Sequence, residues 1–155
     1  MKGKVAALAV VLICAPFVAE REGVILSRYK DPVGIPTACV GETDKEVVGF
    51  KQLFTRDECI AVMGASLYAH AVELDKCVKR PIARHEAAAI LSLSYNIGVS
   101  AFCKSTLARL MNSGAPASQW CQEFDKWVFA KGIKLRGLVK RRAAERRMCE
   151  TGKWA

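Results

Sequence analysis

Glu22, Asp31 and Thr37 are the residues of this chain whose types and spacing could support catalysis. Apolar residues precede Glu22, whereas Asp31 is followed by Pro32 and a turn-forming stretch. Hydrolysis of a glycosidic bond needs a protonated acid at the leaving oxygen and a carboxylate on the other side of the sugar ring. Apolar neighbours favour a protonated Glu22, and the Thr37 hydroxyl could hold a water against Asp31. Since such residues also occur on most protein surfaces, the triplet alone leaves this chemistry a hypothesis.

The elements that must position these residues are a helix, a turn and an extended segment. The pattern allows the helix that carries Glu22 to continue over residues 17–30. Pro32 disfavours helical backbone for Asp31 and therefore ends that helix. Residues 35–43 are rich in β-forming and small residues, which predicts a short hairpin or extended pair.

The remainder of the chain predicts helices. Thr55 and Glu58 form a capping-box pattern, which predicts a helix of about 22 residues toward Cys77. Residues 85–97 are almost wholly apolar, which predicts a central buried helix that ends at Gly98. Shorter helices are expected at about 101–112, 117–129 and 137–149. The predicted fold class is therefore α+β, mostly helical, with strands confined to the N-terminal third.

Length and charge limit the possible partners. A chain of 155 residues suits one packed core, and its formal net charge of +9 favours an anionic partner. Nucleic acid, anionic lipid and an acidic cell-wall polymer all satisfy that charge. The sequence lacks a helix-turn-helix or zinc motif, and its basic residues are not interleaved with aromatic ones, which argues against nucleic acid.

The cysteines favour disulfides over a metal site. None of the seven lies in a C-x-x-C pair, and His70 and His85 lack the spacing of zinc ligands, so we expect no metal and no cofactor. Scattered cysteines fit an oxidising compartment, and buried free thiols in a cytosolic protein are the alternative. The odd count leaves at least one thiol unpaired within a monomer.

Residues 5–19 form an uncharged, weakly hydrophobic run after Lys2 and Lys4. As a helix this run spans about 22 Å, short of the roughly 30 Å of bilayer hydrocarbon. A cleaved signal peptide, a permanent anchor, and an uncleaved segment that inserts and later leaves the bilayer are all open interpretations, as is a core helix of a cytosolic protein. The two lysines favour a cytoplasmic N-terminus with the remainder outside.

Four blocks of sequence together resemble the phage-type lysozymes. The first is E-x8-D-x5-T within EG…YKDPVGIPTACVG, and the second is TRDEC at 55–59. The third is ILSLSYNIGVSAFCKSTLARLMNSG at 90–114, and the fourth is KWVFAKGIKLRGLVKRRAAERRMCETGKW at 126–154. The blocks follow in the family's order, and the resemblance runs from about residue 18 to residue 154.

The resemblance implies a two-lobed lysozyme-like fold with a small N-terminal β element and a helical C-terminal lobe. It implies a muramidase that cleaves the β-1,4 bond between N-acetylmuramic acid and N-acetylglucosamine in peptidoglycan with inversion. In that family the residue matching Glu22 is the general acid. The residue matching Asp31 aids the attacking water, and the one matching Thr37 positions it.

Three further residues take expected roles from the same resemblance. Arg141, with Arg142 as the near alternative, matches an arginine that pairs with the acid. On its own, however, the run that contains them is typical of a solvated helix face. Asn96 lies where the family lines the sugar cleft.

The apolar N-terminus also has a counterpart in the family. It matches the lysozymes with a signal-arrest-release segment, in which membrane depolarisation frees the enzyme. We therefore expect residues 1–19 to be a membrane segment and residues 20–155 the catalytic domain. The expected location is the periplasmic face of the inner membrane, followed by release into the periplasm as a monomer.

Placing the segments on the family fold implies three disulfides: Cys39–Cys59, Cys77–Cys103 and Cys121–Cys149. Cys14 is then the odd thiol. It is expected to be idle, and the alternative is a thiol that rearranges a disulfide after release.

Two other classes of function remain as alternatives. A lytic transglycosylase would cut the same bond but leave a 1,6-anhydro end. A membrane-tethered, non-enzymatic protein would use its basic helices to bind the wall or the membrane, with salt-sensitive binding that survives the loss of Glu22.

Overall fold

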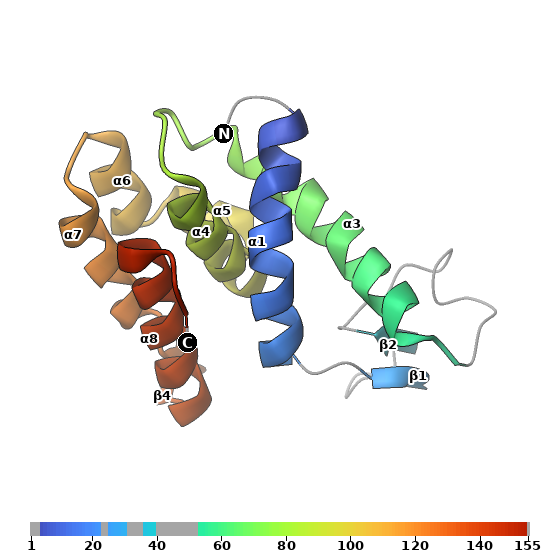
Figure 1. The fold of residues 1–155 in the computed structure, drawn as a ribbon. Coiled ribbons are helices and arrows are strands. Elements are labelled where there is room, and N and C mark those ends of the chain that lie inside the picture. Colours follow the sequence, from blue (N-terminus) through green and yellow to red (C-terminus); the bar gives the residue numbers. More distant parts are fainter. Residues whose placement is uncertain (1–3, 23–24, 31–35, 40–52, 155) are drawn as a thin grey trace.

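The computed structural model describes residues 4–22, 25–30, 36–39 and 53–154. Figure 1 shows a small two-stranded sheet at one end of the molecule and helices over most of the remainder. The described elements are α1 (Lys4–Glu22), β1 (Ile25–Lys30), β2 (Pro36–Cys39), α3 (Arg56–Leu74), α4 (Arg84–Ile97), α5 (Val99–Cys103), α6 (Thr106–Asn112), α7 (Ala117–Trp120), the 3-10 helix η1 (Cys121–Lys126), β3 (Phe129–Ala130), β4 (Ile133–Lys134) and α8 (Arg136–Thr151). The predicted α+β, mostly helical class is confirmed.

Helix α1 contains the whole apolar N-terminal run. It packs against α3 and α4. Its inner face is buried at helical spacing through Ala7, Val10, Val11, Cys14, Phe17 and Val18. The opposite face leaves Leu8 53% and Leu12 68% exposed. Among the described residues, none of the helices combines the length and the apolar content that a bilayer span requires.

The helix that carries Glu22 is shorter than predicted. It ends at Glu22, and Ile25–Lys30 is strand β1 rather than helix, so the predicted continuation to residue 30 is wrong. Glycine at position 23 is a poor helix former, and the β-branched and aromatic residues that follow favour a strand. Strand β2 pairs antiparallel with β1, with Tyr29 opposite Thr37. The predicted extended segment is confirmed over Pro36–Cys39, and its remaining residues lie outside the described part.

Helix α3 begins with the predicted capping box. The Thr55 hydroxyl accepts a hydrogen bond from the Glu58 amide at 3.2 Å, and the Glu58 carboxylate accepts one from the Thr55 amide at 2.7 Å. The helix ends at Leu74 rather than near Cys77. Its buried stripe consists of Cys59, Met63, Leu67, Ala71 and Leu74.

Helix α4 is the predicted central helix. Residues 87–94 are buried without exception, and the helix packs against α1, α3 and α8. It ends at Gly98, whose φ of 89° is a backbone conformation that favours glycine. This prediction is confirmed.

The C-terminal third is more divided than predicted. The expected helix at 101–112 is two helices, α5 and α6, because Ser105 caps the second by accepting a hydrogen bond from the Ala108 amide at 3.1 Å. The expected helix at 117–129 consists of α7 and η1 and stops at Lys126. Helix α8 extends slightly beyond both predicted ends.

A second hairpin follows η1, so the prediction that strands are confined to the N-terminal third is wrong. Strands β3 and β4 pair antiparallel. The turn between them consists of Lys131 and Gly132, with φ of 49° and 78°. Two successive residues with positive φ form a tight hairpin turn, and the glycine makes that turn accessible.

Three disulfides link the described elements: Cys39–Cys59, Cys77–Cys103 and Cys121–Cys149. These are the three pairs that the family resemblance implies. Cys14 is a free, buried cysteine.

Candidate functional site

The structure places two of the three predicted catalytic residues, Glu22 and Thr37, in α1 and the first hairpin. Glu22 is the last residue of α1, and Thr37 lies in β2. Lys30, the residue before Asp31, pairs with Pro36, the residue before Thr37. Asp31 itself and the side chains of Glu22 and Thr37 lie outside the described part of the chain, so their catalytic geometry stays a prediction.

The last turn of α1 is held by aromatic contacts. Phe17 is fully buried, and its ring meets the edge of Trp154 with a centroid distance of 6.0 Å. The Arg21 guanidinium lies over the same ring, 5.2 Å from its centroid. These contacts hold the C-terminal part of α1 against the C-terminal segment of the chain.

The two predicted arginines lie in a buried ionic cluster on α8. Arg142 and Glu145 are fully buried, and Arg141 is 7% exposed. The Glu145 carboxylate accepts hydrogen bonds from Arg141 Nε at 3.1 Å and from Arg142 Nη2 at 3.0 Å. Its other oxygen lies 2.7 Å from Arg142 Nε. Both arginines are therefore interior residues, and the solvated-face interpretation of this run does not hold for them.

Helix α4 completes the cluster. The Ser92 hydroxyl donates a hydrogen bond to Glu145 Oε1 at 2.6 Å. Burial raises the pKa of the Glu145 carboxyl, and the Arg142 charge, the Ser92 hydrogen bond and Arg141 act in the opposite direction. A buried carboxylate requires such partners. The same contacts hold both guanidinium groups in position.

Neither Glu145 nor Ser92 is among the site residues that the sequence predicts. The signal for Glu145 was its spacing, because it lies four residues after Arg141 and three after Arg142, on one helix face. Ala144, Met148 and Cys149 beside it are buried, which marks that face as interior. No local pattern identifies Ser92, whose partner is 53 residues away.

Cys14 of α1 lies close enough to this cluster for the charges of Glu145 and Arg141 to affect the pKa of its thiol. Burial raises the pKa of the Cys14 thiol far above its ordinary value, and the Glu145 charge raises it further. The thiol is therefore protonated at physiological pH, and a protonated thiol is a poor nucleophile. This favours the idle interpretation of Cys14 over the switch.

Asn96, the predicted cleft residue, is exposed in the last turn of α4. Its neighbour Tyr95 packs edge-to-face against His70 with ring centroids 5.0 Å apart. Trp127 is half-buried against the core. Asn96 is thus available to a ligand, whereas the two aromatic side chains are partly engaged by the protein.

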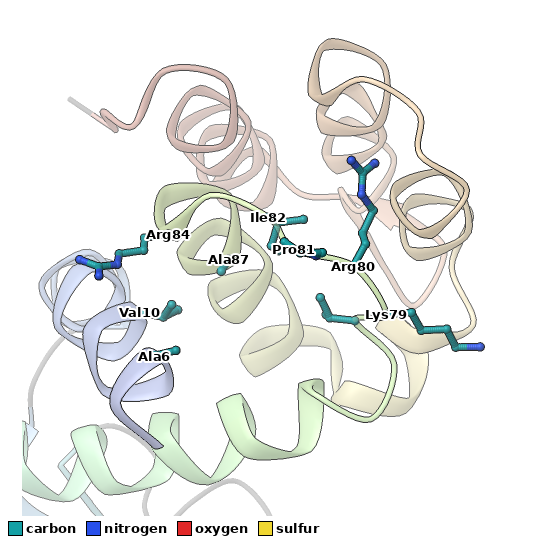
Figure 2. Close-up of a pocket in the computed structure, with 9 residues that line it drawn as sticks. Ala6, Val10, Lys79, Arg80, Pro81, Ile82, Arg84 and Ala87 are labelled. Carbon is teal, nitrogen blue, oxygen red and sulfur yellow. The ribbon is translucent and has the colours of Figure 1, made fainter. Parts of the chain in front are cut away.

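Two hollows lie along α1, and one of about 560 Å³ reaches its C-terminal half at Ala15, Ala19 and Glu20. A pocket of about 380 Å³ lies beside the N-terminal half of α1, and its apolar lining comes from Ala6, Val10, Val78, Pro81, Ile82 and Ala87 (Figure 2). Val10 precedes Glu22 by twelve residues, which is about 18 Å along a helix. Among the described residues, no three His, Cys, Asp or Glu side chains are grouped closely enough to hold a metal ion.

Known proteins give a consistent assignment. Residues 19–145 match the family model described as phage lysozyme. The SAR-endolysin of Bacteriophage PS119 is 35% identical over 154 residues, which cover 99% of this chain and 91% of that protein. A solved structure of a P22 lysozyme mutant is 28% identical with a TM-score of 0.78, over 88% of this chain and 94% of that one. The endolysin from Escherichia coli O157:H7 phage FAHEc1 is 25% identical with a TM-score of 0.79, over 90% and 92%. The chain belongs to the phage lysozyme family.

Proposed function

We propose that this lysozyme-type glycoside hydrolase, an endolysin that hydrolyses peptidoglycan and lyses the host cell, acts through Glu22, Asp31 and Thr37. The bond cut is the β-1,4 link between N-acetylmuramic acid and N-acetylglucosamine, and the anomeric configuration inverts. The observation that carries the proposal is the junction at Glu22. In this chain, which belongs to the phage lysozyme family, α1 ends at Glu22 and the next elements are the paired strands β1 and β2, of which β2 carries Thr37.

Each residue has a distinct role in the proposed reaction. Glu22 donates a proton to the leaving oxygen, Asp31 accepts the proton of the attacking water, and Thr37 orients that water. The C-terminal end of a helix carries partial negative charge, which favours the protonated form of an acid placed there. That form is the one a general acid needs.

Arg141 is the proposed partner of Glu22 after the proton has left, with Arg142 as the near alternative. Hydrogen bonds to Glu145 hold both guanidinium groups in position before the reaction, so neither has to be ordered during it. Asn96, exposed at the end of α4, is proposed to contact the sugar chain.

Substitution of the acid tests the catalytic proposal. Glu22→Gln is expected to abolish release of reducing sugar from purified peptidoglycan while leaving the unfolding midpoint unchanged. Glu20→Gln is the matched control, because the Glu20 side chain is 62% exposed. The substitution removes only its ion pair with Arg21, in which the two charged groups lie 3.9 Å apart. Product analysis by mass spectrometry should find a free reducing N-acetylmuramic acid. A 1,6-anhydro end would instead identify a lytic transglycosylase, and full activity of Glu22→Gln would end the assignment of the acid.

We also propose that residues 1–19 hold the protein at the periplasmic face of the inner membrane, and that residues 20–155 act as a monomeric catalytic domain after release. The SAR-endolysin relatives and the apolar outer face of α1 support this. In this proposal the folded state is the one after release, since a helix packed in the core cannot also lie in the bilayer.

Cell fractionation tests the membrane step. Before depolarisation the chain is expected in the membrane fraction, and an ionophore should move it to the soluble periplasm with its original N-terminus. Size-exclusion chromatography with light scattering should then give a monomer mass. Cleavage after Ala19, or a soluble pool before depolarisation, would exclude the proposed release.

A further inference from the structure

A polar hollow of about 690 Å³ lies between the segment that follows α3, the end of α5, and α6. We call it the basic hollow. Its lining includes the cations Lys76, Lys79, Lys104 and Arg109 and the hydroxyl groups of Ser105, Thr106 and Ser113. Helix α6 lies far from the β1–β2 hairpin in Figure 1, so the hollow is separate from the proposed catalytic residues. Its volume is in the range of ligand-binding sites.

The basic hollow has an unbalanced charge. None of the described residues that line it is Asp or Glu. Within the part of the chain that the structure describes, none of its four cationic side chains forms a salt bridge. Basic residues elsewhere, such as Lys126 and Arg146, are paired with carboxylates at 2.7 and 2.6 Å.

A disulfide and hydrogen bonds hold together the chain segments that carry these exposed cations. The Cys77–Cys103 disulfide joins the residues next to Lys76 and Lys104, with Cα atoms 5.6 Å apart. Asn112 fixes the same segment, since its Nδ2 donates to the Cys77 carbonyl at 2.8 Å and its Oδ1 accepts from the Lys79 amide at 2.9 Å. Like charges held together repel one another, and a bound anion removes that repulsion.

The lining identifies the kind of anion. Binding to a bilayer surface usually adds exposed apolar side chains that enter the lipid. None of the large exposed apolar side chains of the described residues lines this hollow. The Ser105 and Thr106 hydroxyl groups and the Arg109 guanidinium instead suit small oxyanions, both carboxylates and phosphates. Of these two, carboxylates are the anions that the proposed substrate supplies. The stem peptides of peptidoglycan carry free carboxylates, and the proposed substrate presents them at regular intervals.

We propose that the basic hollow binds stem-peptide carboxylates of peptidoglycan, as a second contact away from the bond that is cut. This rests on the proposed function for the identity of the polymer. Two contacts on one polymer raise the effective concentration of each, so the enzyme stays on the wall between cuts.

Binding to purified sacculi tests the proposal without requiring turnover. All proteins carry Glu22→Gln, so that the wall is not degraded during the measurement. Lys76→Gln with Lys104→Gln is compared with Lys131→Gln with Lys134→Gln, which removes the same charge from the exposed β3–β4 hairpin. Each pair is measured on intact sacculi and on glycan strands stripped of stem peptides by an amidase.

The expected result is that Lys76→Gln with Lys104→Gln lowers binding to intact sacculi about fivefold, because two exposed ionic contacts are lost. Binding to stripped glycan should not change, and the control pair should keep its preference for intact sacculi. Arg109→Gln should reproduce the loss if the double variant does not fold.

Equal losses in the test and control pairs would mean that only net charge matters, and would overturn the proposal. So would an undiminished preference of the Lys76→Gln, Lys104→Gln protein for intact sacculi. Loss of binding to phosphatidylglycerol vesicles, with sacculus binding unchanged, would assign the hollow to lipid phosphate instead. Failure of the proposed function is separate, since it would appear as missing product from the active chain while sacculus binding persists.

Discussion

Helices α1 and α4 are both apolar on most of their surface, but the protein holds them in different ways. The middle of α4 is buried on every side, and its Ser92 hydroxyl is tied to Glu145 of α8. Helix α1 is buried on one face only, and Leu8 and Leu12 remain exposed on the other. The composition of α4 is therefore explained by the folded core, whereas that of α1 exceeds what the core requires.

The covalent bonds follow the same division. All three disulfides join residues outside α1, and the free cysteine is the one that α1 carries. Among the α1 side chains that the structure describes, the one salt bridge is internal, between Arg21 and Glu20. Helix α1 is thus apolar and has no covalent link to the cross-linked body, as expected if it begins in lipid and joins the fold later.

The largest effect is expected where α4 is tied to α8. Glu145→Ala removes a buried carboxylate that pairs with the guanidinium groups of Arg141 and Arg142, and should lower the free energy of unfolding by about 3–5 kcal/mol. Urea unfolding followed by circular dichroism measures this. Glu150→Ala is the control, because its pair with Arg146 is partly exposed and worth less than about 1 kcal/mol. Equal losses in the two variants would mean that the buried cluster does not hold the helices.

A smaller loss is expected when a cross-link of the body is removed. Cys77→Ala with Cys103→Ala opens a loop with a sequence separation of 26 residues. Removing that constraint on the unfolded chain should cost about 3 kcal/mol. The measurement is the unfolding midpoint against that of the wild type under non-reducing conditions. If instead the midpoint is unchanged, the rigidity of this body does not depend on the disulfide.

Much of this division could be predicted from sequence. The capping pair Thr55 and Glu58 marked the start of α3, and the unbroken apolar residues of 85–97 marked α4, because both signals are local. The end of α1 was misjudged because the apolar residues that begin strand β1 also fit a helical face. The turn at Lys131 and Gly132 was missed because it requires positive φ at a lysine, which composition does not indicate.

The residues of the candidate site also differ in whether the sequence can predict them. The prediction of Glu22, Asp31 and Thr37 rests on spacing within a family motif, which is a property of sequence alone, and it stays a prediction. The contact of Ser92 with Glu145 could not be predicted, because it depends on how α4 and α8 pack, and no local pattern records that packing.

Removing the thiol of α1 should have a smaller effect still. Cys14→Ala deletes one buried atom and should lower the free energy of unfolding by about 1 kcal/mol. Lytic activity should be retained, because the raised pKa of Cys14 keeps its thiol protonated. Unfolding in urea and clearing of chloroform-treated Gram-negative cells measure the two quantities. A severe loss of lysis in a folded variant would instead support a thiol switch.

The smallest change in stability is expected on the outer face of α1. Leu12 is 68% exposed, so Leu12→Ser should alter the free energy of unfolding by less than about 0.5 kcal/mol. Val11→Ser on the inner face is the control, and should be clearly destabilising because Val11 is 5% exposed.

The same substitution separates the two environments of α1. In a bilayer, the helix face that carries Leu12 would contact lipid instead of water, so a serine at position 12 weakens insertion. Leu12→Ser should therefore bring the protein into the soluble periplasmic fraction earlier, although the stability of the released enzyme is unchanged. Unaltered timing of release would mean that the apolar surplus of α1 has no membrane role, and the contrast with α4 would then need another cause.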